Sequence, residues 1–273
     1  MLTFQKKLDK IVKKNNSLLC IGLDSDFEKI PTYLKKEKNA VFKFNKAIID
    51  KTHDLVCAYK PNSAFYEAYG ADGIKQLKMT CDYLRKKYHD IIIILDAKRG
   101  DIGSTNEGYI KYVFDYLGVD GLTIQPYLGK ESVLPFLALK DKGLIVLCRT
   151  SNPGAGEFQD LEINKIPLYK IVAQRVLKLW NKNNNCLMVI GATYPKELAE
   201  IRKISGDMTF LVPGIGVQGA DLEKTVKAGL NSRKAGMIIN SSRGIIYASN
   251  GSDSAAKARE EATKLKDQIN FYR

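Results

Sequence analysis

The stretch Asp90-Ile91-Ile92-Ile93-Ile94-Leu95-Asp96-Ala97-Lys98 indicates the architecture that we expect for the whole chain. Its apolar run, 91–95, is too continuous for a half-exposed strand and predicts a strand of a parallel sheet, buried on both faces. Similar short runs recur along the sequence, each bounded by turn-forming residues. Together the eight predicted strands are 18–23, 55–59, 91–95, 121–125, 144–148, 186–190, 209–212 and 237–240.

Segments with helical periodicity separate these runs, at 41–51, 73–88, 107–117, 168–180 and 195–204, and a last helix is expected over 255–269. Strand–helix alternation repeated eight times predicts a single-domain (β/α)8 TIM barrel over residues 1–273. An extra N-terminal helix, 4–13, is expected to precede the barrel and cap its bottom.

An open, doubly wound sheet is the alternative fold, because Gly214-Ile215-Gly216-Val217-Gln218-Gly219 matches the glycine pattern of dinucleotide-binding folds. In such folds the pattern follows the first strand, and an acidic residue comes about 20 positions later. Here it follows the seventh predicted strand, and residues 236–244 contain no acid. The barrel is therefore favoured.

The formal net charge of +13 comes from lysines scattered along predicted helices. Nucleic-acid-binding proteins usually gather such residues into a stripe or a recognisable motif, so we expect the lysines to lie on solvated faces and expect no nucleic-acid partner.

No apolar run approaches the ~20 residues that cross a bilayer, and the first residues do not resemble a signal peptide. We expect a cytoplasmic protein with no membrane partner.

Cysteine and histidine usage narrows the chemistry. None of the five cysteines forms a CxxC pair, and most lie in apolar runs, so buried free thiols are expected. The two histidines, His53 and His89, fall at predicted helix ends rather than at strand ends. This argues against a Ser-His-Asp or Cys-His mechanism and against a histidine-rich metal site. Lys, Asp and Glu are left for acid–base work.

Charged residues gather where two neighbouring strands end. Asp96 and Lys98 alternate along the third predicted strand, so they point to the same side. Lys60, at the end of the second strand, is expected beside Asp96, and Asp101 follows three residues after Lys98. Barrel active sites lie at the carboxyl ends of the strands. A structural role, closing one end of the barrel, is the alternative to a catalytic one.

A phosphate site is expected at the same end of the barrel, in the loops after the seventh and eighth strands. These loops are Gly214–Gly219 and Ser241-Ser242-Arg243-Gly244. Glycines let backbone N–H groups approach phosphate oxygens, and an arginine pairs with phosphate through two bonds. The alternative is that the glycines only form tight turns.

The motif Asp96-Ala97-Lys98-Arg99-Gly100-Asp101-Ile102-Gly103-Ser104-Thr105 closely resembles the signature of orotidine 5′-phosphate decarboxylases, in the longer-chain branch found in some bacteria and protozoa. Further stretches match the family in the same order along most of the chain. They are Gly22-Leu23-Asp24, Lys60-Pro61-Asn62-Ser63-Ala64-Phe65-Tyr66, Thr150-Ser151-Asn152-Pro153-Gly154-Ala155, Pro213–Gly219 and Asn240-Ser241-Ser242-Arg243-Gly244-Ile245.

The resemblance implies conversion of orotidine 5′-monophosphate to uridine 5′-monophosphate, the last step of de novo pyrimidine synthesis, without a cofactor or a metal. Lys98 would stabilise and protonate a C6 carbanion, with Asp96, Asp101 and Lys60 completing the catalytic set.

The resemblance also implies substrate-binding roles. Asp24 and Lys60 would bind the ribose, Ser151 the pyrimidine, and Gln218 and Arg243 the phosphate, with Pro213, Gly219 and Ser242 as further contacts. Asp101, Ile102 and Thr105 would reach the neighbouring subunit's site, which implies a homodimer.

Two other functions remain open at this point. A Mg²⁺-dependent sugar-phosphate decarboxylase or aldolase-like barrel shares the Asp-x-Lys-x-x-Asp pattern, but by resemblance it carries an acid where Lys60 stands. A non-catalytic phosphate- or nucleic-acid-binding protein would have no need of the charged set. The polar segment after the fifth strand, 152–164, is a candidate lid.

Overall fold

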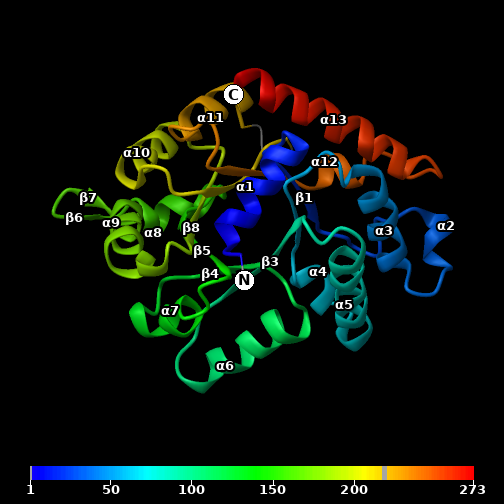
Figure 1. The fold of residues 1–273 in the computed structure, drawn as a ribbon, viewed down its shortest axis with the longest axis horizontal. Coiled ribbons are helices and arrows are strands. Elements are labelled where there is room, and N and C mark those ends of the chain that lie inside the picture. The colour runs from blue at the N-terminus through cyan, green and yellow to red at the C-terminus, as the bar shows by residue number, and fades with distance from the viewer. Residues whose placement is uncertain (1, 217–219) are drawn as a thin grey trace.

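Eight parallel strands close into a barrel in the computed structural model, which describes residues 2–216 and 220–273 (Figure 1). Neighbouring strands follow the order β1-β10-β9-β8-β5-β4-β3-β2, and pairing of β1 with β10 completes the ring. The strands are β1 (Leu19–Leu23), β2 (Ala58–Pro61), β3 (Ile92–Arg99), β4 (Gly121–Ile124), β5 (Gly143–Arg149), β8 (Cys186–Ile190), β9 (Phe210–Pro213) and β10 (Met237–Ser241). The predicted barrel is confirmed. The open sheet is wrong, because such a sheet would leave β1 and β10 unpaired with each other.

Helices surround the strands and connect each one to the next (Figure 1). The main ones are α3 (Ala40–Thr52), α5 (Gly70–Lys87), α6 (Ser104–Ile110), α7 (Lys130–Leu137), α9 (Leu168–Arg175), α10 (Pro195–Ser205), α11 (Leu222–Gly229) and α13 (Ser254–Tyr272). Shorter turns are α2 (Thr32–Lys35), α4 (Ala64–Glu67), α8 (Gly156–Gln159) and α12 (Arg243–Ile246), with 3-10 turns at Pro153–Ala155 and Asn181–Asn183. A small hairpin joins β6 (Glu162–Ile163) to β7 (Ile166–Pro167). The helices predicted over 107–117 and 168–180 each continue as a π-helical turn, at Lys111–Tyr116 and Val176–Trp180.

The expected N-terminal helix, α1 (Phe4–Asn15), covers the amino end of the barrel. Phe4 is 1% exposed, and its ring lies where β4 and β5 begin. A Cβ atom on Gly143 would come within 2.6 Å of that ring, so the strand needs glycine there. Lys7 adds an ion pair of 2.6 Å to Asp120, beside the start of β4.

Strands β2 and β3 extend beyond the carboxyl ends that the hydrophobic pattern predicts, by two and four residues respectively. β2 runs to Pro61 because Lys60 and Pro61 pair with Gly22 and Leu23 of β1. β3 continues past Leu95 to Arg99, which pairs with Ile124 of β4. In both cases pairing with a neighbouring strand carries polar residues into the sheet. The extensions bring Lys60 and Asp96 into the barrel wall.

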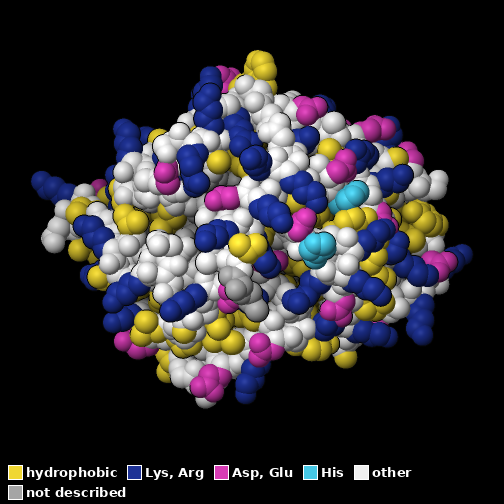
Figure 2. Space-filling view, viewed as in Figure 1, with side chains coloured by type: hydrophobic (Ala, Val, Ile, Leu, Met, Phe, Trp, Pro, Cys, Tyr) yellow, Lys and Arg dark blue, Asp and Glu magenta, His cyan; other side chains and the backbone are white. Residues whose placement is uncertain are grey.

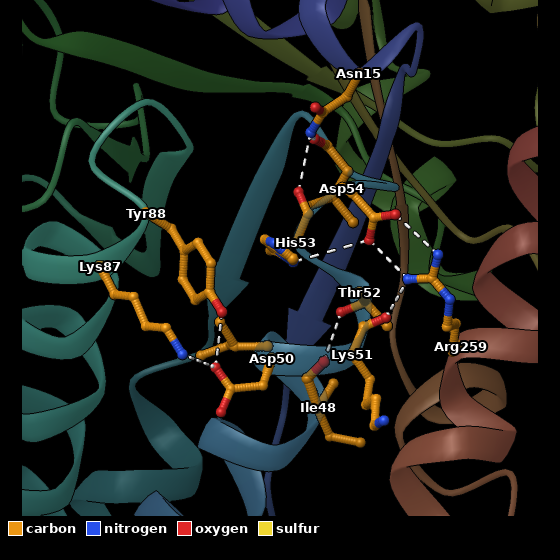
Figure 3. A network of polar contacts seen from close by, with 12 residues as sticks. Asn15, Ile48, Asp50, Lys51, Thr52, His53, Asp54, Lys87, Tyr88 and Arg259 are labelled. Atoms are coloured by element: carbon orange, nitrogen blue, oxygen red, sulfur yellow. Dashed lines mark hydrogen bonds and ion pairs between the residues drawn. The ribbon is translucent and has the colours of Figure 1, made fainter.

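The amino end of the barrel also holds both histidines, as their helix-end positions predict. They line a cavity between α1 and the ends of α3 and α5, away from the strands' carboxyl ends. Figure 3 shows how polar side chains tie these helices together: Asp54 binds Arg259 of α13 at 2.6 and 2.8 Å, and Asp50 accepts a bond from Tyr88 at 2.8 Å. This network belongs to the scaffold.

Charged surface residues and cysteines lie in the kinds of place that the sequence predicts. Figure 2 shows Lys and Arg side chains spread over one face with acidic side chains among them, rather than gathered in one stripe. The five cysteines are all buried and free, as expected. Within residues 2–216 and 220–273, no helix combines the length and apolar character needed to traverse a bilayer.

Candidate active site

A cavity of about 160 Å³ opens at the carboxyl ends of β1, β2, β3, β9 and β10. Six of the residues predicted to form the site line it: Asp24, Lys60, Asp96, Pro213, Ser242 and Arg243. Asn62, Gly214, Ile215, Asn240, Ser241 and Gly244 complete the wall. Residues far apart in the sequence meet here because parallel barrel strands all end at the same rim.

Asp96 lies between two ammonium groups. One carboxylate oxygen accepts a hydrogen bond from Lys60 Nζ at 2.8 Å, and the other accepts one from Lys98 Nζ at 2.7 Å. The side chains of Lys60 and Asp96 are 4% and 13% exposed, whereas that of Lys98 is 51% exposed. The predicted Lys60–Asp96–Lys98 row is therefore present, with Lys98 at its open end.

Burial and charge pull the pKa values of this row in opposite directions. Burial alone would raise the pKa of Asp96, but the ammonium groups of Lys60 and Lys98 hold it well below its usual range. Burial likewise favours neutral Lys60, yet the carboxylates of Asp96 and Asp24 raise its pKa above its ordinary value. The buried pair is thus kept in its ionised form.

Lys98 has an unusual backbone conformation, with φ at +48°. For a residue with a side chain this left-handed region costs roughly 1–2 kcal/mol. The strain falls on the residue that ends the charged row. Neighbouring contacts must offset it, since such conformations persist only where the surroundings fix them.

Asp24 follows β1 and reaches the same cavity. Its carbonyl oxygen accepts a bond of 2.9 Å from the Tyr247 hydroxyl, which fixes the backbone. Its Oδ1 atom is buried, and none of the described residues offers it a hydrogen bond. A buried carboxylate oxygen without a partner carries a desolvation cost. A ligand hydroxyl in the cavity would remove that cost.

The glycine-containing loop after β9 and the turn after β10 form the opposite wall. Gly214 and Gly216 have φ values of +106° and +95°, which side chains other than glycine rarely adopt. The turn after β10 packs so closely on β1 that a Cβ atom on Gly22 would lie 1.8 Å from Ser242 Oγ. Arg243 is exposed at the cavity wall. Predicted Gln218 and Gly219 lie outside the described residues.

Asp101, Ile102 and Thr105 do not line the cavity. The Asp101 carboxylate accepts a bond of 2.7 Å from the backbone N–H of Ile102, and within residues 2–216 and 220–273 no ion pair links Asp101 to Lys60 or Lys98. Ile102 is 61% exposed, and Thr105 is exposed as well. Among the described residues, Asp101 therefore makes no ion pair with the other three members of the predicted charged set within one chain.

Ser151 also lies outside the cavity wall, at the end of β5 beside the end of β8. Its backbone lies so near Gly191 that a Cβ atom there would be 2.6 Å from Ser151 Cα. Thr193 donates a bond of 3.2 Å to the Ser151 carbonyl. Two neighbouring loops thus fix the backbone of Ser151.

Sequence reasoning missed Arg149, one residue before this loop. Its side chain is only 2% exposed, and its guanidinium stacks on the Tyr194 ring at 3.9 Å and binds Asp160 at 3.1 Å. Gln159 accepts a bond of 2.8 Å from the Thr150 N–H. These contacts fasten the predicted lid segment to β5. The sequence shows a basic residue beside Thr150, but it does not show that its carboxylate partner is Asp160, eleven positions further on.

The described part of the chain contains no group of three or more His, Cys, Asp or Glu side chains arranged to hold a metal ion. The cavity wall instead contains the buried ions Lys60 and Asp96, together with residues of the loops after β9 and β10. The strained Lys98 is not among the residues that line the cavity, but it contacts Asp96 there. Such an arrangement suits an anionic ligand on which negative charge develops near Lys98.

Comparison with known proteins bears directly on this arrangement. Residues 17–258 match the family model described as Orotidine 5'-phosphate decarboxylase / HUMPS family. A curated orotidine 5'-phosphate decarboxylase of Cellvibrio japonicus is 51% identical over 274 residues, covering 100% of both chains. The solved Leishmania donovani OMP decarboxylase is 37% identical, with a TM-score of 0.84 over 99% of this chain and 100% of that one. Leishmania donovani UMP synthase has a TM-score of 0.89 at 38% identity; the chain is matched completely but spans 57% of that longer protein.

The ion row predicts how stability depends on pH. Because the folded pKa of Asp96 is depressed, its contribution is complete above the unfolded value of about 4 and is lost as pH falls through the folded value. Lys60→Met removes a buried partner and should cost about 3 kcal/mol at neutral pH. The difference in the free energy of unfolding between wild type and Lys60→Met should become smaller below about pH 4.

Urea denaturation on both sides of that pH measures the free energy of unfolding. Lys35→Met is the control, because it removes a lysine that contacts the mostly exposed Glu28 at 3.3 Å, away from the cavity. It should leave the pH dependence unchanged. If the difference in unfolding free energy between wild type and Lys60→Met stayed constant as the pH fell below about 4, Lys60 would not be what lowers the pKa of Asp96.

Proposed function

The chain belongs to the orotidine 5′-phosphate decarboxylase / HUMPS family, and from this premise we propose that it converts orotidine 5′-monophosphate to uridine 5′-monophosphate and CO₂. This is the last step of de novo pyrimidine nucleotide synthesis. The observation that carries the proposal is the Lys60–Asp96–Lys98 row beside the loops after β9 and β10. Relatives about half identical over the full length bear the decarboxylase name.

The chemistry requires a lone pair to be left on C6 of the pyrimidine. When the bond from C6 to the carboxylate breaks, CO₂ leaves and its electron pair stays on the ring. The Lys98 ammonium group stabilises that charge and then donates its proton to C6, after which solvent reprotonates the amine. Asp96 holds Lys98 and lies beside the departing carboxylate, where its repulsion raises the ground state.

Substrate binding is assigned to the rest of the cavity. Asp24 and Lys60 bind the ribose hydroxyls, which gives the buried Asp24 Oδ1 its missing partner. Arg243 and Gln218 bind the phosphate, with Pro213, Gly219 and Ser242 as further contacts. Ser151 contacts the pyrimidine. Binding energy from the remote phosphate holds the charged row and the loops in place for reaction.

We assign the active form to a homodimer in which Asp101, Ile102 and Thr105 complete the partner's site. Support comes from exposed apolar residues on the same side: Tyr127 is 87% exposed and Leu128 47%, close to exposed Ile102. The two loops are neighbours, since Gln125 donates a bond of 2.8 Å to the Gly100 carbonyl. Covering these residues with a second subunit would bury apolar surface.

A sugar-phosphate enzyme dependent on Mg²⁺ fits the cavity less well. Lys60 stands where such barrels would need an acid, and its ammonium group would repel the cation. A cytoplasmic location goes with the decarboxylase proposal, because all five cysteines are free thiols, as is usual in reducing compartments.

The first test is the loss of orotidine 5′-monophosphate absorbance with purified protein, with and without EDTA. Turnover should be the same in both, because no step of the proposed mechanism uses a metal. Lys98→Ala should lower kcat at least ~10⁴-fold, as it removes both the stabilising charge and the proton donor. Activity that disappears with EDTA and returns with Mg²⁺ would favour the sugar-phosphate alternative.

The second test concerns Arg243. Arg243→Ala should lower kcat/KM for the nucleotide by about 2–4 kcal/mol, mainly through KM, because a charge-assisted phosphate contact is lost. With orotidine, which lacks the phosphate, the substitution should hardly matter. The comparison uses both proteins with both substrates. Equal losses for nucleotide and nucleoside would remove Arg243 from the phosphate site.

The third test concerns subunit sharing. Asp101→Ala and Lys98→Ala proteins should each be inactive alone, and mixing them should restore some activity. A hybrid dimer then contains one site with both defects and one site with neither. Native mass spectrometry establishes that subunits exchange. Exchange without any recovered activity would contradict sharing of Asp101.

A further inference from the structure

The end of β3 is irregular where it meets β4. Leu95 pairs with Leu122 and Arg99 pairs with Ile124, so Asp96, Ala97 and Lys98 face the single residue Thr123. Three residues opposite one form a bulge, in which backbone groups lose their partners in the ladder. The bulge holds both ends of the Asp96–Lys98 contact.

The Thr123 hydroxyl takes the place of the missing ladder partners. Its Oγ1 atom accepts hydrogen bonds from the backbone N–H groups of Ala97 and Lys98, both at 3.0 Å. The same hydroxyl donates its proton to Asp96 Oδ1 at 2.9 Å. One donor and two acceptor sites are all that a threonine hydroxyl has, so its bonding capacity is fully used.

These three bonds fix the parts of the site whose orientation matters most. The bond to the Lys98 N–H secures the residue at its left-handed φ of +48°. The bond to Asp96 reaches the same Oδ1 atom that accepts from Lys98 Nζ. Backbone and side chain are thus tied to a single oxygen on β4, the neighbouring strand.

Thr123 itself is 1% exposed and is not part of the cavity wall. We propose that Thr123 is a positioning residue for the decarboxylation, in which its hydroxyl holds the β3 bulge so that Lys98 Nζ and the Asp96 carboxylate face C6 of the bound nucleotide. This inference rests on the proposed function for its chemistry, but the geometry it describes does not.

Replacing the hydroxyl by a methyl group tests the idea with little change in volume. In Thr123→Val, kcat for orotidine 5′-monophosphate should fall about 100-fold, the scale expected when a reacting group is displaced by about 1 Å. KM and the Kd of UMP should change little, since the ribose and phosphate contacts remain. Thr123→Ser keeps the hydroxyl and should restore kcat close to wild type. Thr123→Ala replaces the valine variant if that protein does not fold.

Thr209→Val is the matched control. Thr209 is also a buried threonine, 2% exposed, but it lies at the amino end of the barrel and its hydroxyl binds Gln5 at 2.9 Å. Its removal should leave kcat unchanged whatever it does to stability. Wild-type kcat in Thr123→Val, an equal loss in Thr209→Val, or a serine variant as impaired as the valine variant would each overturn the proposal.

Crystal structures of wild type and Thr123→Val give a readout independent of activity. Lys98 should leave the left-handed region in the variant, and its ammonium group should move from Asp96. An unchanged Lys98 would overturn the positioning role. If the wild-type protein does not decarboxylate the nucleotide, the proposed function fails, while this structural comparison still decides what Thr123 holds.

Discussion

The carboxylate of Asp96, shared between two ammonium groups, is the interaction on which the rest of the site depends. Taking an anion and two cations out of water is unfavourable unless their attraction and hydrogen bonds offset the cost. Lys60 at 2.8 Å, Lys98 at 2.7 Å and the Thr123 hydroxyl at 2.9 Å together occupy the carboxylate. A polar row can therefore stand at the end of a barrel whose strands are otherwise apolar.

The charged row lies at the carboxyl end of the barrel, whereas α1 covers the amino end. At the amino end, α1 packs Phe4 onto the beginnings of β4 and β5, and Asp54, two residues after α3, forms an ion pair with Arg259 of α13. The left-handed φ of Lys98 and the buried Asp24 Oδ1, to which no described residue donates a hydrogen bond, occur at the carboxyl end beside the cavity. Unfavourable features of this kind are expected where a protein prepares a site for its ligand.

Much of this arrangement was predictable, because it depends on local patterns. Apolar runs and helical periodicity predicted the barrel, and strand alternation placed Lys60, Asp96 and Lys98 together. The bulge was not predictable, since three residues face Thr123 only once β3 and β4 are in register. Arg149 was missed because its contacts depend on how two loops fold: Asp160 lies in the segment after β5 and Tyr194 in the loop after β8. Sharing of Asp101 stays a prediction, as it needs a second chain.

Because the amino end of the barrel is covered, it affects how substrate and products enter and leave the cavity. Phe4 covers the amino end of the barrel, and the cavity opens at the rim formed by the strands' carboxyl ends. Substrate, CO₂ and the product nucleotide would therefore all pass through the same rim. CO₂ is small and uncharged, so it needs a narrower opening at this rim than the nucleotide does.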